Sequence, residues 1–208
     1  GKSHTLAIKT DGTLWAWGDN LDGKLGTTGT IQLSPEKIGT DTWSQLAAGT
    51  DHSLAIRPAG TRWAWGSNID GQLGDGTSIS RSTPVQVSSL SGVAAIAGGD
   101  LHTVALKTDG TVWAWGSNYR GQLGDGTTTA RSTPVQVTGM SGVAVIAGGS
   151  YDTVALIKNR TQDVIFSTDC GIKAGQLLLK APRSSYARCK DWEACGSECF
   201  VKSWKVFW

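Results

Sequence analysis

The sequence predicts an all-β fold, a β-propeller of four-stranded blades that this chain completes only in part. Residues 51–100 and 101–150 are identical at roughly two thirds of their positions, and a worn copy opens the chain. A repeat of about fifty residues is typical of propeller blades. Gly is abundant (28 residues) and Pro is scarce (5 residues), as expected of a chain with many tight turns.

Each copy contains four runs of strand-forming residues separated by turn residues. In the third copy these runs are residues 93–97, 103–107, 112–115 and 134–137. Asp109-Gly110 lies between two runs and predicts a type I′ hairpin, which needs positive φ at both central residues. Pro134 opens the last run and cannot donate to a ladder, so this strand is expected at the outer edge of the blade.

Large and small side chains alternate along the third run. Trp113 and Trp115 share one face of the strand, and Val112 and Ala114 share the other. Such strands suit sheets that stack face to face, with the Trp face of one blade against the small face of the next. We therefore interpret the recurring Trp pairs as packing residues: Trp15, Trp17, Trp63, Trp65, Trp113 and Trp115.

The composition changes near residue 157. Residues 1–157 have a charge balance of −2 and contain the predicted blades 1–42, 43–92 and 93–142 and the start of a fourth, 143–157. Residues 158–208 have a balance of +4 and hold every Cys, and we interpret them as a degenerate repeat or a Cys-containing tail.

The tail cysteines are candidates for disulfides: Cys170, Cys189, Cys195 and Cys199. Disulfides would imply an oxidising compartment, such as the cell surface or exterior. Free thiols, or a tail that is not a native product, are the alternatives. The spacing lacks the Cys-x2-Cys hooks of zinc sites, so no metal is expected.

The third copy resembles the regulator of chromosome condensation repeat. The resemblance rests on His102-Thr103, Asp109-Gly110-Thr111, Trp115-Gly116 and Gly121-Gln122-Leu123-Gly124, which recur in order, and it covers residues 1–157. It implies a seven-bladed ring, of which this chain holds about three to four blades. The open ends then imply a piece of a longer protein, pairing with another copy, or a tail that caps the open blade.

The family resemblance also suggests two activities. Nucleotide exchange on a small GTPase is the family's founding activity, but the chain shows no wedge-like insertion and no basic tail for chromatin. The related plant ultraviolet-B photoreceptor has a Trp in a Gly-Trp-Arg-His-Thr motif, and Gly1-Lys2-Ser3-His4-Thr5 lacks it.

Most residues that resemble catalytic groups recur once per blade, which favours a structural role. His4, His52 and His102 occupy one repeat position, where we expect buried imidazoles bonded to backbone at a tight corner. The Gly-rich corners lack the Lys-Ser/Thr of a phosphate-binding loop and the acidic ligands of a calcium loop. We therefore expect no enzyme activity and no cofactor.

The two near-identical copies differ in their predicted loops, where recognition residues are usually found. The candidate binding residues are Ile69, Asp70, Tyr119, Arg120 and Tyr151. The leading hypothesis is a non-enzymatic module that binds a protein partner through these loops. The alternatives are a regulator of a small GTPase and an assembly subunit that self-associates through its open blade edges. With a net charge of +2 and no long apolar run, neither nucleic acid nor a membrane span is expected.

Overall fold

The chain folds into four antiparallel sheets that follow one another along the sequence. The computed structural model describes residues 1–87, 90–158 and 164–167. The first sheet holds β1 (His4–Ile8), β2 (Thr13–Asp19) and β3 (Ile31–Thr42), with a 3-10 turn η1 (Leu21–Gly23). The second holds β4 (Gln45–Ala48), β5 (His52–Ile56), β6 (Arg62–Gly66) and β7 (Arg81–Gln86). The third holds β8 (Val93–Gly98), β9 (His102–Lys107), β10 (Val112–Gly116) and β11 (Arg131–Gln136).

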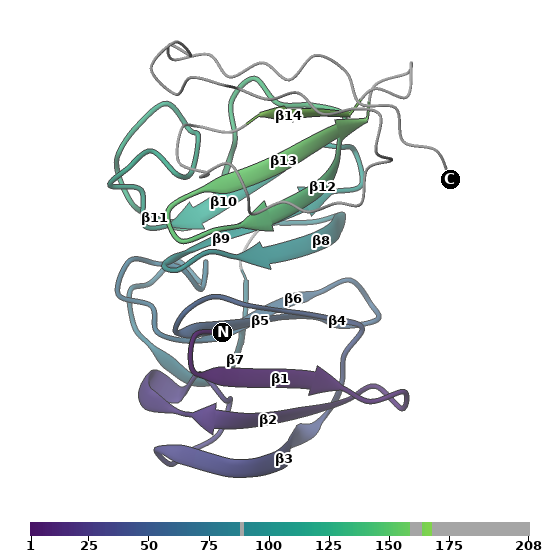
Figure 1. The fold of residues 1–208 in the computed structure, drawn as a ribbon, viewed down its shortest axis with the longest axis vertical. Helices are drawn as coiled ribbons and strands as arrows, with labels where there is room; N and C mark the ends of the chain where they lie inside the picture. Colours follow the sequence, from purple (N-terminus) through teal and green to yellow (C-terminus); the bar gives the residue numbers. More distant parts are fainter. Residues whose placement is uncertain (88–89, 159–163, 168–208) are drawn as a thin grey trace, which may run out of the picture.

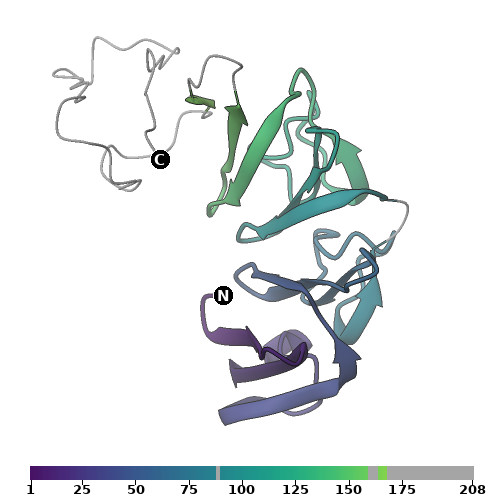
Figure 2. The same ribbon diagram turned by 90° about the vertical axis from the view of Figure 1, so that its right-hand side faces the viewer.

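The fourth sheet contains β12 (Val143–Gly148), β13 (Thr153–Lys158) and β14 (Val164–Ser167). The four sheets stack as successive blades along an open arc (Figures 1 and 2). The predicted fold class, an incomplete propeller of four-stranded blades, is confirmed. β14 lies beyond residue 157, where the sequence suggests that the tail begins.

The interfaces between blades are filled by the Trp side of one sheet and the small side of the sheet before it. Trp65 is fully buried in one cluster with Leu14 and Ala16 of the first blade. Trp115 is buried with Leu54 and Ala64 of the second blade. Each buried indole removes a large apolar surface from water, so these interfaces supply much of the stability of the stack.

The outermost strands begin earlier than the sequence suggests. β11 starts at Arg131, so Pro134 lies within the strand and not at its start. Pro is tolerated there because β11 is an edge strand and its pairing with β10 is interrupted by a bulge between Ala114 and Gly116.

The predicted type I′ hairpin is wrong. Gly110 has φ +80°, but Asp109 does not have positive φ, because Asp22 is the only non-glycine residue with positive φ in the described part of the chain. Gly110 N donates to Lys107 O, and Lys107 N donates to Thr111 O. This pattern is a three-residue loop in which a type I turn is followed by a left-handed glycine.

The up-and-down order of the strands gives the stack two faces. The loop face carries three long loops, L1 (residues 20–30), L2 (67–80) and L3 (117–130), and the short turns 49–51, 99–101 and 149–152. The backbone joins the two kinds of segment, since Ser67 N donates to Asp51 O and Ser117 N to Leu101 O. The opposite hairpin face carries the turns at residues 9–12, 57–61 and 108–111.

Candidate interaction surface on the loop face

The long loops are fixed by an internal hydrogen-bond network. In L2 the buried Asn68 accepts a bond from Leu73 N and donates to the carbonyls of Thr77 and Ile79. Asn118 makes the corresponding bonds in L3. A buried amide that satisfies several backbone groups holds one loop conformation, so the loop face is preorganised.

A second contact closes each of the two loops. Asp125 lies 2.8 Å from Arg131, and the same pair in L2, Asp75 and Arg81, is 3.0 Å apart. Burial opposes ionisation of Asp125, but hydrogen bonds from Thr127 and Arg131 outweigh burial and lower its pKa to about 2. The carboxylate is therefore charged and stays paired at any physiological pH.

Exposed apolar side chains gather on the loop face. Leu21, Ile69 and Tyr119 occupy the same position in L1, L2 and L3 and are 65%, 68% and 71% exposed. Of the eight exposed large apolar residues among the described ones, five lie on this face: Leu21, Ile69, Ile79, Tyr119 and Tyr151. Apolar groups gathered on one rigid face are a common sign of a binding surface.

The structure brings four of the five candidate binding residues into two contacts between blades. The Tyr119 hydroxyl donates to Asp70 across 3.3 Å, which joins L3 to L2. The Arg120 guanidinium lies 5.2 Å from the Tyr151 ring centre, which joins L3 to the turn of the fourth blade. Ile69 is exposed beside Asp70. These residues therefore form one row across three blades.

The three histidines connect neighbouring blades through side-chain hydroxyls. At His102 a hydrogen bond with the backbone of Asp152, on the tight turn 149–152, also acts on the ring, as the sequence suggests, and opposes the lowering of its pKa by burial. Nε2 of His4, His52 and His102 lies 3.0, 3.0 and 3.2 Å from the hydroxyls of Ser53, Thr103 and Thr153 in the next blade. Each hydroxyl gives its single proton to a carbonyl of the His-bearing blade, so the imidazole must donate from Nε2. The rings are therefore structural links between neighbouring blades.

Burial controls the titration of these imidazoles. It lowers the pKa of His52 from 6.5 to about 3 and those of His4 and His102 to about 4. The glycine three residues earlier makes room for each ring: a Cβ on Gly99 would lie 2.0 Å from Cε1 of His102. The recurring Gly-x-x-His pattern is thus a steric requirement of the interface.

The first interface between blades is held by charge. Nζ of Lys24, which is 1% exposed, lies 2.6 Å from both Asp19 and Asp51. Burial alone would lower the pKa of Lys24, but the two carboxylates outweigh it and raise that pKa. The Lys24 hydrogen bond lowers the pKa of Asp19. At the corresponding positions the second interface has Ser67, Gln72 and Leu101, and the third has Ser117, Gln122 and Tyr151.

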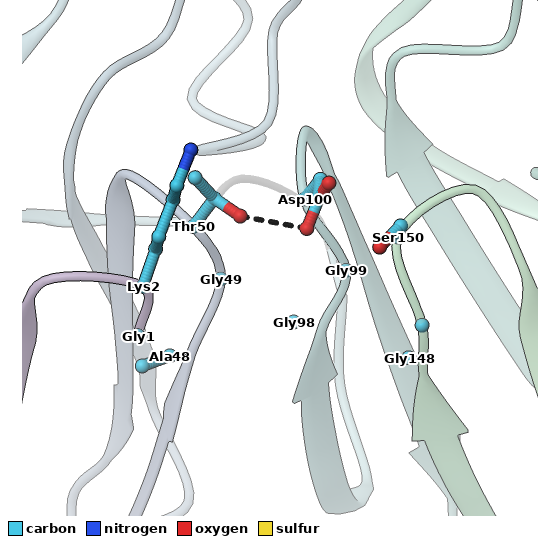
Figure 3. A pocket seen from close by; sticks show the side chains of 11 residues that line it. Gly1, Lys2, Ala48, Gly49, Thr50, Gly98, Gly99, Asp100, Gly148 and Ser150 are labelled. Atoms are coloured by element: carbon cyan, nitrogen blue, oxygen red, sulfur yellow. Dashed lines mark hydrogen bonds between the residues drawn. The ribbon is translucent and has the colours of Figure 1, made fainter. Parts of the chain in front are cut away.

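A cavity of about 530 Å³ opens between the inner turns of the blades. Lys2, Thr50, Asp100 and Ser150 surround it from four successive blades (Figure 3). Thr50 donates to Asp100 across 2.6 Å, so the carboxylate is already partnered. Glycines and Ala48 line the rest of the cavity.

The structure bears on three further questions from the sequence: the tail cysteines, metal ligands and membrane-spanning helices. Cys170, Cys189, Cys195 and Cys199 lie outside the described residues. Within residues 1–87, 90–158 and 164–167, no three His, Cys, Asp or Glu side chains converge as metal ligands would. In the same part of the chain, no helix has the length and apolar character to cross a bilayer.

Among the described residues, no neighbouring blade covers the Trp face of β2 in the first blade. Trp15 and Trp17 are half-buried there, whereas Trp65 and Trp115, which correspond to Trp17, are 0% and 1% exposed against their neighbours. Self-association through this face stays a prediction.

Sequence reasoning missed the residues that join the blades, namely the hydroxyls and Lys24. The signal was present in the chain, since Ser53, Thr103 and Thr153 each follow the His position directly. Trp43 was also missed: it is 3% exposed and packs edge-on to Trp63, with its ring centre 6.2 Å away.

The fold and the loop face together define a propeller scaffold that presents rigid loops on one side. Residues 11–56, 59–106 and 109–156 match the family model of the regulator of chromosome condensation (RCC1) repeat, and residues 93–122 match a second model with the same description. These matches cover more than half of the chain, which therefore belongs to the RCC1-repeat family. A search of curated proteins found no match.

Solved structures of similar fold come from yeast and human proteins. Yeast RCC1 (Prp20), in its complex with Kap60, is 22% identical over 81% of this chain and 42% of its own, with a TM-score of 0.71. Prp20p from Saccharomyces cerevisiae, whose binding to Gsp1p and histones was described, is 23% identical over 81% and 44%, with a TM-score of 0.68. Human WBSCR16 is 25% identical over 81% and 45%, also with a TM-score of 0.68. The chain thus spans less than half the length of these proteins.

Proposed function

We propose that the chain is a non-enzymatic interaction module that binds a protein partner through the row of Ile69, Asp70, Tyr119, Arg120 and Tyr151. The observation that carries this proposal is the gathering of exposed apolar side chains on the loop face. Tyr and Arg are the residue types most often found at the energetic centre of interfaces. Their loops are fixed by buried amides, so little conformational entropy is lost on binding.

The chain itself offers a variant that alters the row without disturbing the fold. Tyr119→Ile with Arg120→Asp gives L3 the tip that L2 already has, Ile69-Asp70. We expect binding to weaken by at least about tenfold, because the variant removes an aromatic anchor and reverses a charge. Proteins enriched on the wild-type chain would be purified and their affinities for both chains measured by biolayer interferometry.

The control changes an exposed residue of the opposite face in the same manner. Ala59→Asp copies Asp109 of the next hairpin and should leave the affinity unchanged. If the loop variant binds as tightly as the wild type, or if Ala59→Asp weakens binding equally, the row is not the binding surface.

A second candidate function is regulation of a small GTPase. It is supported by the similarity to Prp20p, which binds Gsp1p, although at this identity the similarity covers the fold. The expected result is release of a fluorescent guanine nucleotide faster than its spontaneous rate from at least one member of a purified GTPase panel. Release at the spontaneous rate from every member would contradict this function and leave the first proposal intact.

A further inference from the structure

The centre of each long loop holds one buried residue that makes contacts in two directions, within its own loop and with the next blade. These residues are Lys24 in L1, Gln72 in L2 and Gln122 in L3, with exposures of 1%, 0% and 8%. Through its side chain each holds the tip of its own loop, and through its backbone carbonyl each holds the next blade.

The side chains fix the loop tips. Gln72 Oε1 accepts a hydrogen bond from Asp70 N, and Gln122 Oε1 accepts one from Arg120 N, both at 3.0 Å. In L1 the link has two steps, because Lys24 pairs with Asp19, which accepts a bond from Leu21 N. The tip residues held in this manner are adjacent to, or are themselves, the exposed Leu21, Ile69 and Tyr119.

The carbonyls of the same residues fix the blade interfaces. The carbonyls of Lys24, Gln72 and Gln122 accept the hydroxyls of Ser53, Thr103 and Thr153 at 2.6, 2.8 and 2.9 Å. Each hydroxyl also accepts the hydrogen bond that the His Nε2–H donates. A single residue therefore contacts the loop tip and the neighbouring blade at once.

We infer that Lys24, Gln72 and Gln122 are positioning residues. Each couples the packing of the following blade to the conformation of the long loop in which it lies. The intervening backbone cannot absorb a displacement: in L2, Gly71 N donates to Asn68 O, Leu73 N to the Asn68 side chain, and Gly74 N to Gly71 O. A shift of the Gln72 carbonyl therefore moves its side chain, and with it the Asp70 amide. The consequence for partner binding rests on the proposed function, whereas the coupling itself is measurable without a partner.

The test removes one hydroxyl and measures amide hydrogen exchange in two loops of the same chain. Thr103→Val keeps the shape of the side chain but leaves the Gln72 carbonyl without its donor and His52 Nε2 without its acceptor. We expect exchange of the Asp70 amide to become about tenfold faster, as for loss of one hydrogen bond, while the Arg120 amide in L3 stays unchanged. Thr103→Ser keeps a hydroxyl at this position, as Ser53 does at the first interface, and should give the wild-type exchange rate of the Asp70 amide.

Two outcomes would overturn the inference. An unchanged Asp70 rate in Thr103→Val would show that the interface and the loop are independent, and an equal increase in L2 and L3 would indicate general loosening. Gln72→Asn, whose shorter side chain cannot reach Asp70 N, must also raise the Asp70 rate. If Thr103→Val does not fold, Thr153→Val makes the same test at the outer interface, with L3 responding and L2 as the control.

Discussion

The folded chain is expected to lose stability steeply as the pH falls from 6.5 toward 4. An unfolded His binds a proton near pH 6.5, whereas burial holds the folded-state pKa of His52 at about 3 and that of His102 at about 4. Between these values the unfolded state binds more protons than the folded state, so the free energy of unfolding decreases as the pH falls. At about 1.4 kcal/mol per proton and pH unit, these two rings alone cost roughly 3–5 kcal/mol between pH 6 and pH 4.

The structural reason is that protonation places a second N–H in a buried site without an acceptor. Nδ1 of His52 is buried and has no hydrogen-bond partner among the described residues, and Nε2 already donates to the Thr103 hydroxyl. Urea unfolding at several pH values between 7 and 4 measures the slope. His52→Gln, which retains an N–H donor but does not titrate, should be less stable at pH 7 and show a shallower slope. A wild-type stability that stays flat down to pH 4.5 would assign acid unfolding to the carboxylates.

Replacing Lys24 by Met is expected to cost about 2–4 kcal/mol, because it leaves the carboxylates of Asp19 and Asp51 facing each other without their cation. The side chains of both aspartates are 37% exposed, so water relieves part of the repulsion and keeps the cost below that of a fully buried pair. Denaturant titration near pH 7 measures the change. The pH dependence of the free energy of unfolding of the wild type is a second measurement of the same contact. Ionised Asp19 stabilises the wild type above its unfolded pKa of 3.8, and this contribution is lost as the pH falls through its lowered folded pKa.

The control for this substitution is present in the next interface. Asp19→Ser, Lys24→Gln and Asp51→Leu together reproduce the set Ser67, Gln72 and Leu101. A neutral set that already packs in this chain should bring stability back to within about 1 kcal/mol of the wild type. If Lys24→Met is as stable as the wild type, or if the triple variant is no better than Lys24→Met, charge does not hold the first interface.

The alternation of side chains along each strand was sufficient to predict the blades and their order. Trp113 and Trp115 lie two residues apart, so a strand must place both on one face whatever surrounds it. The hairpin turn was less predictable. Asp-Gly permits two related loops, and the dipeptide alone does not choose between them, because the hairpin at residues 57–61 forms the same three-residue loop with Ala59 in place of Asp109. In the hairpin with Asp109, the Thr111 N–H and hydroxyl add bonds to the Asp109 side chain.

The hydroxyl that follows each His position is visible in the sequence, but its partner in the neighbouring blade could not be predicted, because the two residues are far apart in sequence. His52 and Thr103 are 51 residues apart and meet only once two sheets are stacked. The same holds for the loop face. Tyr119 and Arg120 stand out in the sequence because the second copy has Ile69 and Asp70 at these positions. Their contacts with Asp70 and Tyr151 depend on the angle between blades.

The different residue sets at the interfaces determine where the chain could gain or lose a blade by recombination. Removing residues 76–125 would delete one blade length and bring Gln72 opposite Thr153 and Tyr151, the same neighbours that Gln122 has now. Removing residues 26–75 would instead bring Lys24 opposite Leu101, which has no carboxylate to replace Asp51. The number of neutral blades can therefore change during evolution without a new compensating residue, whereas the first and second blades must be inherited together.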